Sequence, residues 1–234
     1  MRLKSSLFFG LFILWGLAGC QSRTGHDDFT ADELALICNA FNRSEDSLED
    51  KGEYPVGTMR VLTISDPADS SLLREPSHNL SADALLSEEY EKLCSLMVAT
   101  VTHPSQDGVG IAGPQVGLNR RIVAVQRFDK EPVEWSGKTD YPFEVYPNIR
   151  IVSSSDSLAY GPEGCLSVPD RRGEVLRSQE IVIEYADMKA LKMANYASKD
   201  TLIPMRRDTV KGFTAVIFQH EIDHLEGVLY IDRL

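Results

Sequence analysis

Basic residues are in short supply in this sequence of 234 residues. Lysine and arginine number 24 against 35 aspartates and glutamates, so the formal net charge is -11 at pH 7. A surface of this sign repels phosphate backbones, which excludes nucleic acid from the expected partners. Hydrophobic residues make up 43% and charged residues 25% of the chain, as in ordinary globular proteins. The length therefore suits one well-packed catalytic domain with a short appendage.

The N-terminus lacks an apolar stretch long enough to cross a bilayer. Its apolar run extends from Leu7 to Leu17, whereas a spanning helix needs about 20 residues. A basic start precedes this run, and small residues follow it, which is the pattern of a secretory signal. The run ends in Leu17-Ala18-Gly19-Cys20, which resembles the bacterial lipobox, in which the cysteine is lipid-modified and becomes the first residue of the mature protein.

We therefore predict that residues 1–19 are a lipoprotein signal peptide and that Cys20 is the lipidation site. The mature protein would be exported and held on a membrane by its lipid anchor, at the periplasmic face or the outer membrane. Two alternatives are a plain signal peptide in which Cys20 is incidental, and an N-terminal anchor helix.

Cysteine is also scarce, with four in the chain, so few disulfides could form. An oxidising compartment would allow a disulfide between Cys38 and Cys94, the two cysteines without another predicted role. The alternative is that Cys94 is a small buried hydrophobe, which its apolar neighbours in the sequence favour.

Periodic patterns of apolar residues predict a mixed α+β protein with its decisive helix near the C-terminus. Residues 20–54 are expected to form a tether and accessory segment with a short helix at 31–38, and residues 55–234 the catalytic domain. Helices are predicted at 81–102 and at 209–226, and strands at 59–64, 121–126, 143–146, 149–152, 175–176 and 181–185.

The C-terminal helix carries His220-Glu221-Ile222-Asp223-His224. Residues four apart lie about 40° apart around a helix, so both imidazoles can reach one metal ion. Glu221 lies at the side of that face and can act as a general base without being a ligand. The alternative, two core histidines beside a buried carboxylate, would be costly without a metal.

A catalytic four-coordinate site needs a third protein ligand, and Cys165 is the best candidate. It lies in Glu163-Gly164-Cys165-Leu166-Ser167, where Gly164 lets the backbone turn closely and the Leu166 amide could point into the site. A buried structural cysteine is the alternative.

The segment Gly108-Val109-Gly110-Ile111-Ala112-Gly113-Pro114-Gln115 superficially matches a dinucleotide-binding fingerprint. That fingerprint follows a strand and opens a helix, whereas this segment follows a helix and leads toward a strand. We interpret it as an extended edge along which a substrate peptide can bind, with Gln115 donating to a developing oxyanion. An ordinary surface turn is the alternative.

Together, the three motifs resemble those of the peptide deformylase family, in the same order, over roughly residues 55–234. The resemblance implies antiparallel or mixed sheets packed around a metal-binding C-terminal helix. It implies that Cys165, His220 and His224 bind one divalent metal, Fe²⁺ first and Zn²⁺ second. It further implies that Glu221 is the acid and base, and that Gln115 and the Leu166 amide stabilise the tetrahedral intermediate.

The implied substrate is an N-formyl-methionyl peptide, from which the enzyme removes the formyl group. Residues 108–111 and Gly164 are expected to bind that peptide. Gly113 and Ile111 replace the alanine and leucine that the family commonly has in the first motif. The rival hypotheses are an exported metallopeptidase or other N-acyl amide hydrolase, and a non-catalytic lipoprotein that binds peptides.

Overall fold

The computed structural model describes residues 28–46, 57–135, 138–194 and 202–234. The predicted signal peptide, Cys20 and the remainder of the 20–54 segment lie outside these residues. Within the described residues, no helix combines the length and apolar character needed to cross a membrane.

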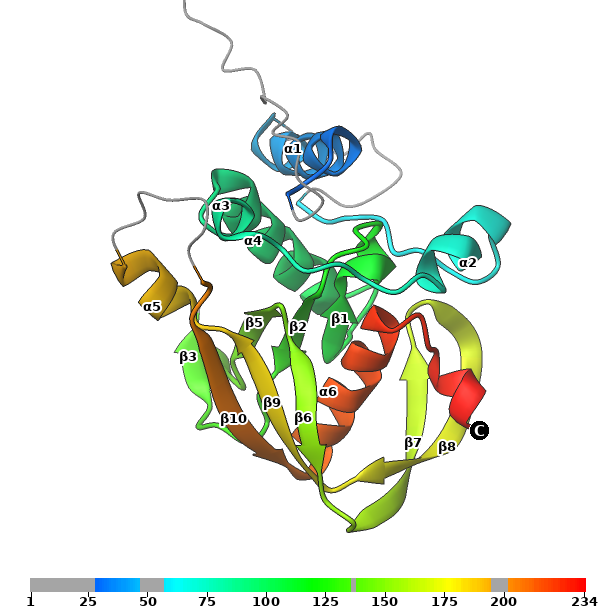
Figure 1. The fold of residues 1–234 in the computed structure, drawn as a ribbon. Coiled ribbons are helices and arrows are strands. Elements are labelled where there is room, and N and C mark those ends of the chain that lie inside the picture. The colour runs from blue at the N-terminus through cyan, green and yellow to red at the C-terminus, as the bar shows by residue number, and fades with distance from the viewer. Residues whose placement is uncertain (1–27, 47–56, 136–137, 195–201) are drawn as a thin grey trace, which may run out of the picture.

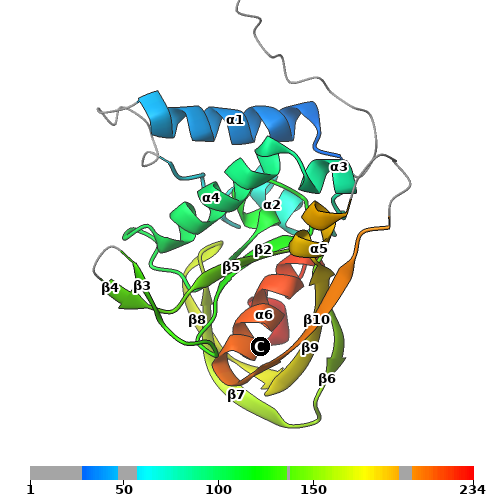
Figure 2. The ribbon, with the colours of Figure 1, turned by 90° about the vertical axis from the view of Figure 1, so that its left-hand side faces the viewer.

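The N-terminal half of the fold is helical. Helix α1 lies across α4, and both contribute to a first core cluster that includes Ile37, Leu93 and Met97 (Figure 2). The helices of this half are α1 (Ala31–Asp46), α2 (Pro67–Leu73), α3 (Ala82–Leu85) and α4 (Glu88–Thr102).

The C-terminal half consists of short antiparallel sheets around one long helix, α6 (Gly212–Leu225). In Figure 1, α6 lies between the sheet β10-β9-β6 and the hairpin β7-β8, and the sheet β1-β2-β5 packs against it through β1 and β2. The strands are β1 (Gly110–Ala112), β2 (Ile122–Gln126), β3 (Val133–Trp135), β4 (Lys138–Asp140), β5 (Phe143–Pro147), β6 (Arg150–Ser154), β7 (Leu158–Cys165), β8 (Val168–Ser178), β9 (Glu180–Ala186) and β10 (Met205–Lys211). The remaining elements are α5 (Met188–Met193), η1 (Gly113–Val116) and η2 (Tyr230–Arg233).

The α+β prediction is confirmed, and so are the strands predicted at 121–126, 143–146, 149–152 and 181–185. The pair predicted at 175–176 belongs to the longer strand β8. The predicted helix 81–102 is divided into α3 and α4, because the Ser87 side chain accepts the Tyr90 amide and starts a new helix there.

The strand predicted at 59–64 is wrong. Its amides bond to four separate partners instead of one neighbouring strand: Met59 to the Thr100 hydroxyl, Leu62 to the Gln115 carbonyl, Thr63 to the Asp69 carboxylate and Ile64 to the Ser167 carbonyl. The segment is therefore irregular, and it contacts the backbone of two predicted motifs, at Gln115 and at Ser167.

The start predicted for the last helix is also corrected. Residues 209–211 end strand β10, and α6 begins at Gly212, whose φ of 59° turns the chain from strand to helix. No disulfide links any two of the described cysteines, Cys38, Cys94 and Cys165, so the predicted Cys38–Cys94 bond is wrong. Cys94 packs against the first core cluster, as the alternative interpretation predicts.

Candidate active site and metal centre

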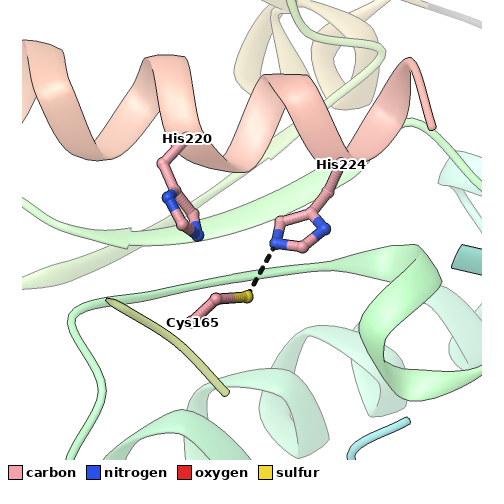
Figure 3. Close-up of side chains that lie close together, drawn as sticks. All are labelled: Cys165, His220 and His224. Atoms are coloured by element: carbon pink, nitrogen blue, oxygen red, sulfur yellow. Dashed lines mark hydrogen bonds between the residues drawn. The ribbon is translucent and has the colours of Figure 1, made fainter. Parts of the chain in front are cut away.

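Three side chains from two distant segments meet at the centre of the molecule. His220 and His224 lie one turn apart on α6, and Cys165 ends strand β7 (Figure 3). Their ligand atoms all lie within 4.8 Å of one another, and Cys165 Sγ is 3.2 Å from His224 Nε2. The structure therefore brings together the three residues predicted as metal ligands.

This donor set fits a divalent transition metal. Buried polar atoms normally have partners, yet the described residues offer none to Oε2 of Glu221, which lines the same pocket as Cys165 and His220. Burial lowers the pKa of His224 well below its usual value, so this imidazole is neutral and can donate a lone pair. A thiolate with two imidazoles suits iron or zinc, and three protein ligands leave a position for water.

His220 is oriented by Glu163, which its Nδ1 reaches at 2.8 Å. This bond leaves Nε2 facing the site, as a metal ligand requires. Burial alone would raise the pKa of Glu163, but hydrogen bonds from His220 and Arg177 lower it to about 2. Burial would lower the pKa of His220, but its hydrogen bonds with Cys165 and Glu163 raise it to about 10.

A buried ionic network extends behind Glu163. Arg177 donates to both carboxylate oxygens of Glu163, at 2.7 and 3.0 Å, and to Asp223 at 2.6 Å. Arg233 in turn donates to both oxygens of Asp223. Sequence reasoning did not identify Glu163, Arg177 or Arg233 as functional. No local pattern in the sequence indicates this network, because it depends on the pairing of β7 with β8, which places residues 163 and 177 on the same inner face of the hairpin.

Glu221 is the buried carboxylate beside the three ligands. It is 4% exposed, it lines the site pocket, and burial raises its pKa to about 7. Such a pKa suits a group that accepts and returns a proton near neutrality. A Cβ atom on Gly110 would lie 2.4 Å from Glu221 Oε1, so a glycine at position 110 leaves room for this carboxylate.

Gln115, on the short helix η1, lines the same pocket as Glu221. Its Oε1 accepts the Ala112 amide at 2.8 Å, which directs Nε2 toward Cys165 Sγ, 3.6 Å away, and toward Ser167 Oγ. The side chain is thus a fixed N–H donor pointing at the metal-ligand cluster. Leu166 follows Cys165 in the tight β7-β8 connection and lines the same pocket.

The pocket has a volume of about 750 Å³ and opens above these groups. Gly108, Val109, Gly110 and Gly164, four of the residues predicted to contact a substrate, line this pocket. Ile111 does not line it; it is fully buried in the first core cluster, because successive side chains of β1 point to opposite faces. Three apolar residues of α6 that the sequence analysis left unassigned also line the pocket: Phe213, Val216 and Ile217.

Helix α6 supplies the two imidazoles and the buried carboxylate of Glu221, and strand β7 supplies the sulfur of Cys165. This combination of groups defines the class of enzyme to which the site belongs. The site has the donor set and the buried carboxylate of a metal-dependent hydrolase.

The chain belongs to the polypeptide deformylase family, whose model matches residues 58–234. It is 34% identical over 175 residues to a peptide deformylase of Leptospira biflexa, covering 75% of this chain and 87% of the relative. It is 31% identical over 191 residues to a peptide deformylase of Roseiflexus castenholzii, covering 76% and 90%.

Solved structures of the family have the same fold. A Met-Ala-Ser-bound class I type b peptide deformylase from Acinetobacter baumannii superposes with a TM-score of 0.59 at 29% identity, over 76% of this chain and 98% of that one. The peptide deformylase from Thermotoga maritima gives 0.58 at 27% identity, over 76% and 97%. Members of this family are metal-dependent hydrolases, and so is this protein.

Proposed function

We propose that this protein removes the N-formyl group from N-formyl-methionyl peptides, with Cys165, His220 and His224 as the ligands of one divalent metal. One observation supports the assignment above all. The buried carboxylate of Glu221 and the amide Nε2 of Gln115 both border the pocket at the three converging ligands, so a formyl group there would meet a base and an oxyanion donor together.

The roles of the side chains follow from their positions. The bound metal would supply a water of lowered pKa and polarise the formyl oxygen. Glu221 accepts a proton from the attacking water. Gln115 Nε2 and the Leu166 backbone N–H donate to the oxygen on which negative charge develops. Glu221 then returns the proton to the leaving nitrogen, the formyl C–N bond breaks, and formate and a free α-amine are released.

The peptide is proposed to bind in extended form along Val109 and Gly110, with its methionine side chain against the apolar residues of α6. Phe213, Val216 and Ile217 supply an apolar surface that lines the same pocket as Cys165 and His220. The Met-Ala-Ser peptide in the Acinetobacter baumannii structure supports a peptide as the ligand.

We further propose Fe²⁺ as the native metal and Zn²⁺ as the alternative, because a Cys-His-His set suits both. The proposed location is the outer membrane, or the periplasmic face, through a lipid on Cys20. Gln21 supports the outer membrane in a bacterium with two membranes, since aspartate at that position would favour retention at the inner one.

A panel of blocked and unblocked methionyl peptides tests the activity. The full chain, loaded with Fe²⁺ without oxygen or with Zn²⁺, is incubated with formyl-, acetyl- and unblocked Met-Ala-Ser. We expect release of formate and of one free amine from the formyl peptide alone. Faster release of acetate would instead identify a different N-acyl hydrolase, and cleavage of internal peptide bonds would identify a peptidase.

A further inference from the structure

Helix α1 lies outside the segment that matches the family, which starts at residue 58. It is nevertheless part of the folded body. Phe29, Ile37 and Ala40 are buried in the first core cluster, where they pack with residues of α4. The helix begins with a reciprocal cap: the Thr30 amide donates to Glu33 at 2.7 Å, and the Glu33 amide donates to the Thr30 hydroxyl at 3.2 Å. The cap fixes the position of the Glu33 side chain.

Glu33 joins α1 to the catalytic segment through a buried ion pair. Arg120 donates from Nε and Nη2 to the two oxygens of Glu33, at 2.8 Å each. The side chains are 4% and 12% exposed, and Arg120 also donates to the Asp28 carbonyl. A buried ion pair with two parallel hydrogen bonds fixes the relative orientation of its two side chains. Removing one partner destabilises the fold, because it leaves a buried charge unpaired.

Arg120 in turn lies against the turn that carries Gln115. A Cβ atom on Gly113 would lie 2.6 Å from the Arg120 carbonyl oxygen and 2.9 Å from that of Leu118, so the two stretches of backbone are in direct contact. The Leu118 amide donates to the Gly113 carbonyl at 3.0 Å. On the same face, Leu36 of α1 reaches within 3.3 Å of the Cβ position of Gly117, which ends η1 with a φ of 84°.

The opposite side of this turn is fixed by backbone hydrogen bonds. The His78 amide donates to the Asn119 carbonyl at 3.1 Å, the Arg121 amide donates to the His78 carbonyl at 2.8 Å, and the Leu62 amide donates to the Gln115 carbonyl at 2.7 Å. The turn is thus held between this irregular chain and α1. Because Gly113 has no free space beside Arg120, a shift of Arg120 moves the start of η1 and with it Gln115.

We propose that α1 is a positioning element for the oxyanion donor, acting through Glu33 and Arg120 on the turn 113–120. The inference rests on the role of Gln115 in the proposed function. It makes the N-terminal segment part of the catalytic apparatus, in addition to any use as a spacer. Glu33 and Arg120 are positioning residues, since neither lines the pocket.

The test compares Glu33→Gln with a matched control, Glu184→Gln, in the full metal-loaded chain. Glu184 on β9 is also a largely buried carboxylate, 8% exposed, and accepts from two arginines, Arg150 and Arg207. We expect Glu33→Gln to lower kcat by about tenfold with KM within about twofold and the metal content unchanged, because displacing a catalytic donor by less than about 1 Å costs rate and spares binding. Glu184→Gln should keep the wild-type kcat.

Hydrogen exchange provides a readout independent of activity. The amides of Gly117 and Leu118, which bond within the turn, should exchange faster in Glu33→Gln and at the wild-type rate in Glu184→Gln. If Glu33→Gln does not fold, Glu33→Asp keeps the charge and shortens the side chain, and should show a smaller loss of the same kind.

Two results would overturn the inference: wild-type kcat and exchange in both Glu33 variants, or equal losses in the Glu184 control. An inactive wild-type chain would refute the proposed function instead, and the exchange measurement would still decide whether α1 holds the turn.

Discussion

Glu221 combines burial, a raised pKa and a position beside the ligands, and none of its contacts marks it as a structural carboxylate. We predict that Glu221→Gln keeps the metal and loses hydrolysis by a factor of about 10² to 10⁴, the usual contribution of a general acid–base group. Elemental analysis and formate release measure the two effects separately. A variant that keeps both metal and turnover would remove Glu221 from the mechanism.

Cys165 differs from Glu221 because its sulfur lies among the ligand atoms themselves. Cys165→Ala should therefore lose most of the bound metal while the domain still folds, since two imidazoles alone leave the site incomplete. The matched control is Cys94→Ala, a partly buried cysteine in another cluster, which should bind one equivalent. Stoichiometric metal in Cys165→Ala would show that the ligand assignment is wrong.

At single residues, the sequence allowed more to be predicted about ligands than about their supports. His220 and His224 follow from helical spacing alone, because i and i+4 positions share a face. Glu163 and Arg177 could not be paired in this way, since their contact depends on the register of the β7-β8 hairpin. Strand β7 contains two glycines and a proline and gives no clear alternation from which to read that register.

Among the helices and strands too, those with a local apolar pattern were predicted, and those that depend on partners distant in sequence were not. The buried strand β2 and helix α6 have strong apolar patterns and were predicted within a few residues. Strands β7 and β10 were missed, because most of their side chains are exposed and polar or small. The segment 59–64 has the composition of a strand, but its hydrogen-bond partners are distant in sequence and no local pattern shows them.

A buried arginine stabilises the second core cluster between β2, β5 and α6. Arg127 is 2% exposed, lies over the rings of Tyr146 and Phe218, and pairs with Asp129 and Glu144 among other acids. Burial alone would raise the pKa of both carboxyls. Hydrogen bonds from Arg127 to Asp129, and from Lys130 and Tyr146 to Glu144, outweigh burial and lower both values.

The sign of the pH dependence follows from these shifts. Carboxyls with a lowered folded-state pKa stabilise the fold at pH values above their unfolded pKa, about 4, and this contribution is lost as the pH falls through the folded values. We predict that the free energy of unfolding of the wild type decreases below about pH 4. Arg127→Met should be less stable than the wild type by about 3 kcal/mol at neutral pH, and its free energy of unfolding should decrease less on acidification. Urea unfolding at several pH values measures both, with Lys211→Met as a control in which both partners of the ion pair are exposed. Parallel curves for Arg127→Met and the wild type would rule out this network as the source.

At the scale of the whole molecule, the proposed lipid anchor and the catalytic domain are joined through α1. The described body begins at residue 28, so the stretch 21–27 between Cys20 and this body could reach at most about 25 Å even when fully extended. If Cys20 is lipidated, the enzyme works next to a membrane surface and meets peptides there.

Processing of the N-terminus provides the test of that location. We predict that the mature protein starts at a lipidated Cys20 and fractionates with membranes, because several acyl chains hold a protein where one does so only reversibly. Cys20→Ser should remain unlipidated and leave the membrane fraction, whereas Cys38→Ser should behave as the wild type. Mass spectrometry of the N-terminus is decisive: a native protein that keeps Met1 and stays in the cytoplasm would contradict the lipoprotein hypothesis.

The placement of the ligands also has a mechanical consequence. Cys165 and His224 lie 59 residues apart in the chain, so a metal ion between them acts as a cross-link that ties the β7-β8 hairpin to α6. That hairpin has two strands, and its apolar residues pack only in a small cluster with Tyr230 of η2. A two-stranded hairpin with so small an apolar cluster is not stable by itself. Chelation should therefore lower the melting temperature and expose residues 158–178 to proteases before the rest of the fold, and adding metal back should reverse both effects.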